Sequence, residues 1–303
     1  MQKLWKYTIN NDLTNKNAGY SMWGFANKGG REYFIKQFLS PKYPAQDTQS
    51  SPEFLETKKQ RCRNFVANKK EIYKVLNENS DGNNVRILDF FRVESCYYVV
   101  TEKIDALPWT VEMITALSES ERRRLCRIIA HAVAAFHKGH LIHADLKHEN
   151  ILYTKTQAGS VTAKIIDFDS SFLESSPPAP GEEITGDFNY FAPEVCARSF
   201  GVEVPLSCKM DIFALGVLFH QYYTGSLPIF DQSVYSCPGE ASLRGEHLDI
   251  DEKQLPQEIG ALLRAMLNRN PNRRPTAAEV CESLCRTAAS SPQSKVFFRA
   301  GDL

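Results

Sequence analysis

A short segment in the middle of the chain, residues 143–150 (HADLKHEN), constrains the fold and the chemistry most strongly. It places a carboxylate, Asp145, a cation, Lys147, and a carboxamide, Asn150, within six residues, and a second carboxylate, Asp167, follows the next apolar strand. Oxygen atoms from Asp and Asn suit a hard cation such as Mg²⁺, which takes its other ligands from water and phosphates. A nearby free carboxylate can accept a hydroxyl proton and a lysine can neutralise phosphoryl charge, so the pattern predicts phosphoryl transfer.

Five segments in order resemble motifs of the eukaryotic-type protein kinases. HADLKHEN resembles the catalytic loop H-R-D-L-x-x-x-N, and the tripeptide DFD at 167–169 resembles D-F-G. GDFNYFAPE is similar to the peptide-positioning loop, DIFALG to the helix that anchors the catalytic loop, and NPNRRPT to the segment whose Arg274 would pair with Glu194. The chain is therefore identified as a divergent member of this family. Lys147, two residues after Asp145, resembles the Ser/Thr branch.

Hydrophobic periodicity predicts an α+β fold. Strands are expected at 3–10, 18–26, 31–38, 85–91 and 96–103, with a hairpin turn at 28–30, and a long helix at 53–78. Beyond residue 105 the pattern predicts helices, including 118–138, 209–224 and 256–268. The resemblance implies two lobes. Residues 1–104 would form an antiparallel sheet with one helix, 105–287 a mainly helical lobe, and 288–303 a tail or linker.

The resemblance implies an ATP site between the lobes. The glycine-rich loop G-x-G-x-x-G-x-V would be formed by Gly19, Ser21, Gly24 and Ala26. Lys36 would pair with the α and β phosphates. The remaining wall would comprise Thr101 as gatekeeper, the backbone from Glu102 to Ile104 as hinge, and Leu152 as floor.

Phe34 stands two residues before Lys36, where the family usually has an alanine against the adenine ring. A phenylalanine there is expected to narrow the pocket. The small Ala26, expected to face it from the neighbouring strand, would compensate.

The resemblance also assigns the catalytic roles. Asp145 would orient the substrate hydroxyl, and Asn150 and Asp167 would hold Mg²⁺, with Mn²⁺ as the alternative metal. Lys147 and Lys36 would balance phosphate charge.

Lys36 needs a carboxylate partner from the 53–78 helix, and the candidates are Glu53, Glu56 and Glu71. Residues i and i+4 share a helix face, so the inward glutamate should have an apolar residue four positions later. Glu71 has Val75 there, and we expect Glu71 to be the partner.

Three further positions depart from the family pattern. Asp169 replaces the glycine of D-F-G, and Asp tolerates a positive φ better than most residues. Asp187 replaces a threonine and is expected either to pair with Lys147 or to help position it. Ala144 replaces the arginine that normally binds an activation-loop phosphate, so the enzyme is expected not to need activation-loop phosphorylation.

Residues 167–194 contain no Lys or Arg and seven carboxylates: Asp167, Asp169, Glu174, Glu182, Glu183, Asp187 and Glu194. An added phosphate would meet repulsion there. The same acidity predicts protein substrates with basic residues near the target hydroxyl.

The 36 basic and 36 acidic residues balance, which does not favour general nucleic-acid binding or a polybasic membrane anchor. A basic run, residues 58–74, is expected to be a solvated helix face, with a surface for a docking partner or for nucleic acid as the alternative. The sequence shows no membrane helix or signal peptide, and a cytoplasmic protein is expected.

Two other functions remain open. A scaffold that keeps the kinase fold would result if Phe34, Asp169 and Asp187 impaired nucleotide use or transfer. A small-molecule kinase of related fold is the other alternative, which the peptide-positioning segments and Arg274 disfavour.

Overall fold

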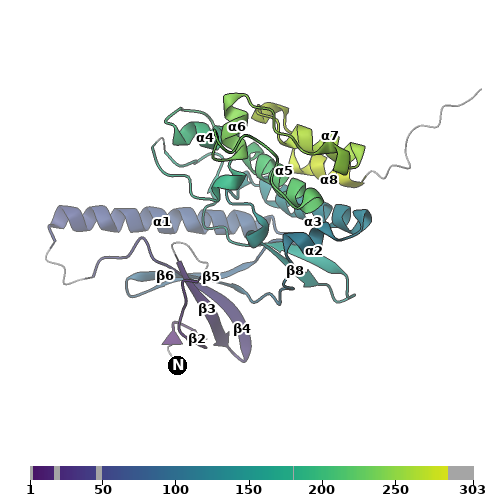
Figure 1. The fold of residues 1–303 in the computed structure, drawn as a ribbon. Helices are drawn as coiled ribbons and strands as arrows, with labels where there is room; N and C mark the ends of the chain where they lie inside the picture. Colours follow the sequence, from purple (N-terminus) through teal and green to yellow (C-terminus); the bar gives the residue numbers. More distant parts are fainter. Residues whose placement is uncertain (1–2, 17–20, 46–49, 180, 286–303) are drawn as a thin grey trace, which may run out of the picture.

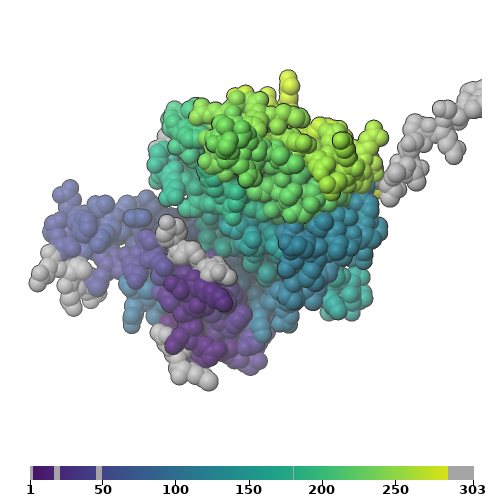
Figure 2. All heavy atoms as spheres, in the orientation of Figure 1, coloured from purple at the N-terminus to yellow at the C-terminus, as the bar shows by residue number. Residues whose placement is uncertain are grey.

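The computed structural model describes residues 3–16, 21–45, 50–179 and 181–285 of the 303-residue chain. The chain forms two lobes, an N-terminal lobe of sheet plus one long helix and a mainly helical C-terminal lobe (Figure 1). In the space-filling view, the N-terminal strands in purple and the helices in green and yellow form separate masses (Figure 2). The predicted α+β, bilobal fold class is confirmed.

The N-terminal sheet has the strand order β1-β2-β3-β4-β6-β5, and every neighbouring pair is antiparallel. Its strands are β1 (Lys3–Leu4), β2 (Tyr7–Ile9), β3 (Ser21–Lys28), β4 (Arg31–Phe38), β5 (Ile87–Val93) and β6 (Cys96–Glu102). The β3–β4 hairpin closes through Gly29 and Gly30 at φ 59° and 79°, a conformation that glycine adopts without steric cost. This two-residue turn sets the register Lys28↔Arg31, which brings Phe25 opposite Phe34.

The long helix α1 (Pro52–Glu78) begins where the Ser51 side chain accepts a hydrogen bond from the Phe54 amide, with proline in the first turn. Its N-terminal part extends past the sheet (Figure 1). Its C-terminal part buries a stripe at helical spacing, formed by Lys69, Ile72, Tyr73 and Leu76. Lys69 is the one charged residue among these four buried side chains, and it contacts the site described below.

The C-terminal lobe contains α2 (Val111–Thr115), α3 (Glu119–His137), α4 (Pro193–Ser199), α5 (Lys209–Thr224), α6 (Pro238–Arg244), α7 (Gln257–Met266) and α8 (Ala277–Cys285). Two small antiparallel pairs lie at its junction with the sheet, β7 (Leu141–Ile142) with β10 (Phe172–Leu173) and β8 (Ile151–Lys155) with β9 (Val161–Ile165). Among the described helices, none is long and apolar enough to cross a membrane.

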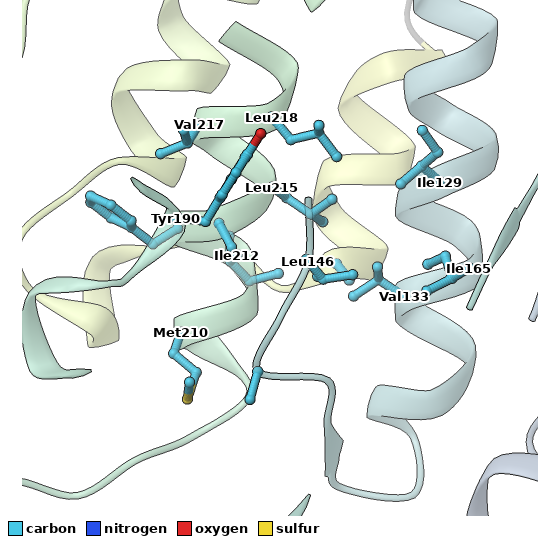
Figure 3. Close-up of a cluster of buried hydrophobic side chains, with 14 of the residues drawn as sticks. Ile129, Val133, Leu146, Ile165, Tyr190, Met210, Ile212, Leu215, Val217 and Leu218 are labelled. Carbon is cyan, nitrogen blue, oxygen red and sulfur yellow. The ribbon is translucent and has the colours of Figure 1, made fainter. Parts of the chain in front are cut away.

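Helix α5 is buried along most of its length and forms the centre of this lobe. Figure 3 shows Ile212 and Leu215 of α5 near Leu146 of the segment 143–150, with Ile129 and Val133 of α3 on the other side. Residues 143–150 therefore pack against α3 and α5, and this packing limits the movement of the polar groups that the segment carries.

The predicted elements lie close to the observed ones, with two differences. The first expected strand is divided into β1 and β2 around Trp5, whose φ is 54°. The second corresponds to β3, which continues to Lys28, and residues 18–20 of that expectation lie outside the described residues.

Candidate active site

The segment 143–150 is anchored to α5 by the buried carboxylate of Asp211. One Asp211 oxygen accepts the backbone N–H of His143 at 2.8 Å, and the other accepts the N–H of Ala144 at 3.0 Å. His137 of α3 contacts the same carboxylate at 2.9 Å. Two hydrogen bonds thus fix this segment to a carboxylate that His137 also holds, although Ala144 adopts a left-handed φ of 66° that an alanine rarely takes.

The Asp145 carboxylate is the centre of the polar cluster above this anchor. Its Oδ2 accepts a hydrogen bond from Asn150 Nδ2 at 2.9 Å and lies 3.1 Å from Lys147 Nζ. Its Oδ1 accepts the backbone N–H of Asp187 at 2.8 Å. The structure therefore brings together three of the four predicted catalytic residues around one carboxylate.

The side chain of Asp187 caps a short helix and does not make the expected ion pair with Lys147. Its carboxylate accepts the Asn189 N–H at 3.0 Å and caps the short helix Phe188–Tyr190. Lys147 pairs with Asp145 instead.

The turn at 167–169 faces this cluster and is held by buried contacts. Phe168 is buried, with its ring 4.7 Å from that of His143. The positive φ of this turn, 63°, belongs to Asp167, whereas Asp169 is outside the left-handed region. The positive φ expected at position 169 is therefore found at position 167, where an aspartate tolerates it.

Lys36 of β4 pairs with both carboxylates of this turn. Its Nζ lies 2.9 Å from Asp167 and 2.7 Å from Asp169. Burial alone would lower the pKa of Lys36, but the adjacent carboxylates of Asp169 and Asp167 outweigh it and raise the pKa above its usual value. Lys36 therefore keeps its charge in the folded protein.

The expected pairing of Lys36 with Glu71 is wrong. Glu71 is exposed on the outer face of α1, and Lys69 occupies the inward position instead. Lys69 Nζ donates a hydrogen bond to the backbone oxygen of Asp169 at 2.6 Å. Burial lowers the pKa of Lys69, and the nearby Asp169 and Asp167 charges partly oppose this effect.

The sequence carries a signal for this position in the spacing of its apolar residues. The buried stripe of α1 was readable from spacing, since Lys69 is followed at three, four and seven residues by Ile72, Tyr73 and Leu76. That spacing identifies position 69 as inward-facing whatever the residue type.

A cavity of about 330 Å³ lies between the sheet and the 167–169 turn, within the range of small-ligand sites. It is lined by Trp23, Phe25, Phe34, Lys36, Tyr73, Val85, Ile87, Val99, Thr101, Glu102, Ile104, Leu152, Ile166, Asp167, Phe168 and Asp169. Phe34, Lys36, Thr101, Glu102, Ile104 and Leu152 were all expected there. The Glu102 carboxylate pairs with Lys164 of β9.

The sheet side of this cavity is aromatic. The Phe34 ring stacks on Trp23 with centroids 5.7 Å apart, and Phe25 meets Phe34 edge-on at 6.2 Å. Trp23 is fixed further because its indole N–H donates to the Lys16 carbonyl at 2.9 Å. These three rings form a preformed apolar wall.

Ala26 does not face Phe34, and its expected compensating role is wrong. Successive strand residues point to opposite faces, and the register pairs Phe34 with Phe25 and Ala26 with Tyr33. Ala26 packs in the cluster on the outer face of the sheet. The hairpin turn at 28–30 already implied this register.

The other expected glycine-loop residues are also displaced from the cavity wall. Gly24 pairs with Ile35, and a side chain at Gly24 would come within 2.8 Å of Leu13. Ser21 is buried opposite Phe38, and Gly19 lies outside the described residues.

Asn150 and Asp167 are suited to a metal that arrives with phosphate. Asn150 donates its amide N–H to Asp145, which turns its carbonyl oxygen away from that carboxylate. Within the described part of the chain, no cluster of three His, Cys, Asp or Glu side chains is placed to bind a metal unaided. Mg²⁺ is commonly held by one or two protein oxygens plus water and substrate phosphates, which matches this donor set.

The segment 186–194, which contacts Asp145 through the Asp187 N–H, is fixed at its other end by a buried ion pair. The Arg274 guanidinium donates to both oxygens of Glu194 at 2.7 and 2.8 Å, as the resemblance implied. Its remaining N–H groups donate to the carbonyls of Asn268, Lys209 and Arg269. All five guanidinium donors are satisfied, so the pair rigidly supports the surface beside Asp145.

Comparison with known proteins shows similarity to protein kinases over most of the chain. A family model described as the protein kinase domain matches residues 53–284. Calcium-dependent protein kinase 6 of Plasmodium berghei is 31% identical over 225 residues, which cover 73% of this chain and 14% of that protein. The serine/threonine-protein kinase PSK2 of Saccharomyces cerevisiae is 28% identical, over 70% of this chain and 18% of that protein.

Calcium-dependent protein kinase 22 of Arabidopsis thaliana is 28% identical over 289 residues, 91% of this chain. The match covers 53% of that protein. The chain thus spans about half or less of the lengths of these three relatives.

Proposed function

We propose that this chain, which belongs to the protein kinase family, is an ATP-dependent Ser/Thr protein kinase that uses Mg²⁺, or alternatively Mn²⁺. The observation that carries the proposal is the convergence of Lys147 and Asn150 on the Asp145 carboxylate, opposite the Lys36–Asp167 pair. Phosphoryl transfer needs positioning and charge compensation rather than covalent chemistry, and these are the groups that supply both.

In this mechanism Asp145 accepts a hydrogen bond from the substrate hydroxyl and orients it toward the transferred phosphoryl group. Lys147, 3.1 Å from Asp145, is placed to balance negative charge that develops at the same point. Asn150 and Asp167 would hold the metal, which neutralises phosphate charge when bound. Lys36 remains cationic and would contact the non-transferred phosphates.

The direct test compares the wild type with Asp167→Asn in an ATP-turnover assay with a generic protein substrate. Loss of the carboxylate should abolish metal-dependent turnover while leaving the fold intact, because asparagine has nearly the same shape. Mg·ATP affinity is measured on the same samples. A wild type that neither binds Mg·ATP nor exceeds the variant in turnover would show that the enzyme proposal is wrong.

We also propose that activity does not depend on activation-loop phosphorylation. Ala144 has no side-chain donor for a phosphate, and the Ser171 hydroxyl is buried and donates to the His143 carbonyl at 3.1 Å. The exposed Thr185 donates to the Ser170 hydroxyl at 2.9 Å. Unmodified hydroxyls therefore already make contacts that order this segment.

The combined variant Ser170→Ala/Thr185→Ala should keep turnover within about tenfold of the wild type, since it removes one neutral hydrogen bond worth about 1 kcal/mol. Turnover of dephosphorylated enzyme is the control. A hundredfold loss in the alanine variant contradicts the proposal.

The substrate preference proposed for this site is basic. Glu182 and Glu183 are exposed beside a groove near the 186–194 segment. Arg198 also lines that groove, and its guanidinium is engaged by the Pro178 carbonyl at 2.8 Å. A peptide array should favour Lys or Arg around the target hydroxyl, and a preference for acidic flanks would overturn this assignment.

The docking surface proposed on α1 has fewer exposed, unpaired cations than the sequence of residues 58–74 contains. Lys69 is buried, and Arg63 and Lys74 pair with Glu56 and Glu78. Lys58, Arg61 and Lys70 are the exposed cations that remain for a protein partner.

A second candidate function, a scaffold with the kinase fold but without transfer, is favoured by the rings of Trp23 and Phe34 in the cavity wall. Autophosphorylation together with thermal stabilisation by Mg·ATP supports the enzyme. A protein that gives neither response supports the scaffold.

A further inference from the structure

We propose that Asp169 is the positioning residue that holds Lys36, and that Lys69 on α1 is the matching cation, so that the carboxylate expected on the helix is supplied by the turn and the helix supplies a cation. The expected arrangement has a glutamate on the helix and an uncharged glycine in the turn. Here the helix carries a lysine and the turn carries a carboxylate. This inference rests on the proposed function, because it assigns how Lys36 is held for phosphate.

The geometry of Lys36 shows why Asp169 is needed in addition to Asp167. Lys36 Nζ is 2.7 Å from the Asp169 carboxylate and 2.9 Å from that of Asp167. Asp167 would also hold the metal, so its carboxylate would not be free to serve Lys36 alone. Asp169 then supplies the carboxylate that keeps Lys36 in place.

The two departures from the family pattern depend on each other. Asp167 and Asp169 place two carboxylates beside the single cation Lys36, all partly shielded from water. A glutamate at position 69 would add a third carboxylate, and like charges in a shared buried site are strongly unfavourable. Lys69 gives two cations for two carboxylates.

Lys69 also connects α1 to the turn directly. Its ammonium donates to the Asp169 carbonyl at 2.6 Å, while the Asp169 side chain contacts Lys36. Asp169 therefore joins the helix and strand β4 through its own backbone and side chain. In the expected arrangement the helix would contact Lys36 itself.

The test is a charge exchange. Asp169→Gly and Lys69→Glu are each made alone and then combined, which moves the carboxylate from the turn to the helix. Each single variant should lower kcat/KM by about tenfold or more, because Asp169→Gly removes the carboxylate nearest Lys36 and Lys69→Glu places three carboxylates beside that one cation. The combined variant should recover to within about threefold of the wild type.

Asp169→Glu is the conservative control and should retain most of the activity, whereas Asp169→Asn should not. Lys69→Met removes the cation without adding a carboxylate and should be less harmful than Lys69→Glu. A purely structural role would give losses that multiply in the combined variant, and that result, or wild-type kinetics in Asp169→Asn, overturns the proposal.

A second measurement separates this inference from the proposed function. Urea unfolding without nucleotide is compared for Lys36→Met, Asp169→Asn and the combination, since a direct pair gives a non-additive cycle. A coupling of at least about fivefold in the unfolding equilibrium constant supports the pair even if the wild type proves inert in transfer. Additive effects overturn it even if the wild type is an active kinase.

Discussion

The two lobes differ in how closely they keep the family pattern. In the helical lobe, Asp211 holds the catalytic segment and Arg274 holds Glu194 with the contacts that the resemblance implied. In the sheet lobe, residues 1–52 lie outside the matched family region, the cavity wall is aromatic, and Lys36 is held by Asp169.

The difference follows from what each lobe must do. On the proposed function, the helical lobe has to place particular atoms around a reacting hydroxyl, and few residue types can replace a carboxylate or a carboxamide there. The sheet lobe has to provide an apolar cavity and one positioned cation. Those two requirements can be met by different residues in different places, so this lobe tolerates exchange.

The largest effect on stability is expected when the buried ion pair of the helical lobe is broken. Arg274→Met leaves the Glu194 carboxylate buried without a partner, and such a loss costs about 3–5 kcal/mol. Chemical denaturation of both proteins measures it. Glu56→Gln, which breaks the exposed Arg63 pair on α1, should leave stability nearly unchanged.

Equal destabilisation by Arg274→Met and Glu56→Gln would remove the proposed contrast between the lobes. Adding Glu194→Leu to Arg274→Met should restore part of the loss, because no unpaired charge then remains buried.

A smaller effect is expected in the aromatic wall of the sheet lobe. Phe34→Ala removes the ring that stacks on Trp23 and should raise KM for ATP by about two- to tenfold, since such aromatic contacts contribute about 0.5–1.5 kcal/mol. The maximal rate should change little, because the transfer groups lie in the other lobe.

Phe91→Ala is the matched control for this substitution. It removes a ring from the same sheet, but Phe91 packs in the outer cluster with Tyr98, away from the cavity. A lower KM in Phe34→Ala would show that the ring obstructs the nucleotide.

The smallest effect concerns stability between pH 7.0 and pH 5.5, the range in which histidines usually titrate, and every histidine of the chain lies beyond residue 105. Burial lowers the pKa of His220, whose ring donates to the Ser226 carbonyl at 2.8 Å. The unfolded chain then binds the proton more readily than the folded protein does. Stability should therefore fall as the pH drops below about 6.5, by at most about 1.4 kcal/mol per pH unit.

Urea unfolding at pH 7.0 and pH 5.5 measures this loss in the wild type and in His220→Asn, which keeps an N–H donor but does not titrate. The variant should lose less stability between the two pH values. An identical pH dependence in both proteins would assign the acid sensitivity to other groups.

The sequence was sufficient for the parts of the site that lie close together in the chain. Asp145, Lys147 and Asn150 fall within six residues, and their geometry follows from the anchoring of one short segment. The fold class was predictable for a similar reason, because hydrophobic periodicity and turn residues are local signals.

The parts that were missed depend on contacts between distant segments. Lys69 and Asp169 are 100 residues apart, and nothing local shows that each makes the other acceptable. Ala26 lies away from the cavity for a different reason. The glycines of the loop motif are a weak signal, whereas the register of the β3–β4 hairpin determines which residues face the cavity. Strand parity was the stronger signal there.

The proposed function requires the helical lobe to transfer phosphate although the sheet lobe departs from the family pattern. It is tested most directly by phosphate incorporation from ATP into a basic peptide by the wild type and by Asp145→Asn, with the exposed Asp12→Asn as a matched carboxylate control. We expect transfer by the wild type and by Asp12→Asn, and a loss of about 10²–10⁴-fold in Asp145→Asn with Mg·ATP affinity retained. Equal incorporation by the wild type and Asp145→Asn would contradict the claim.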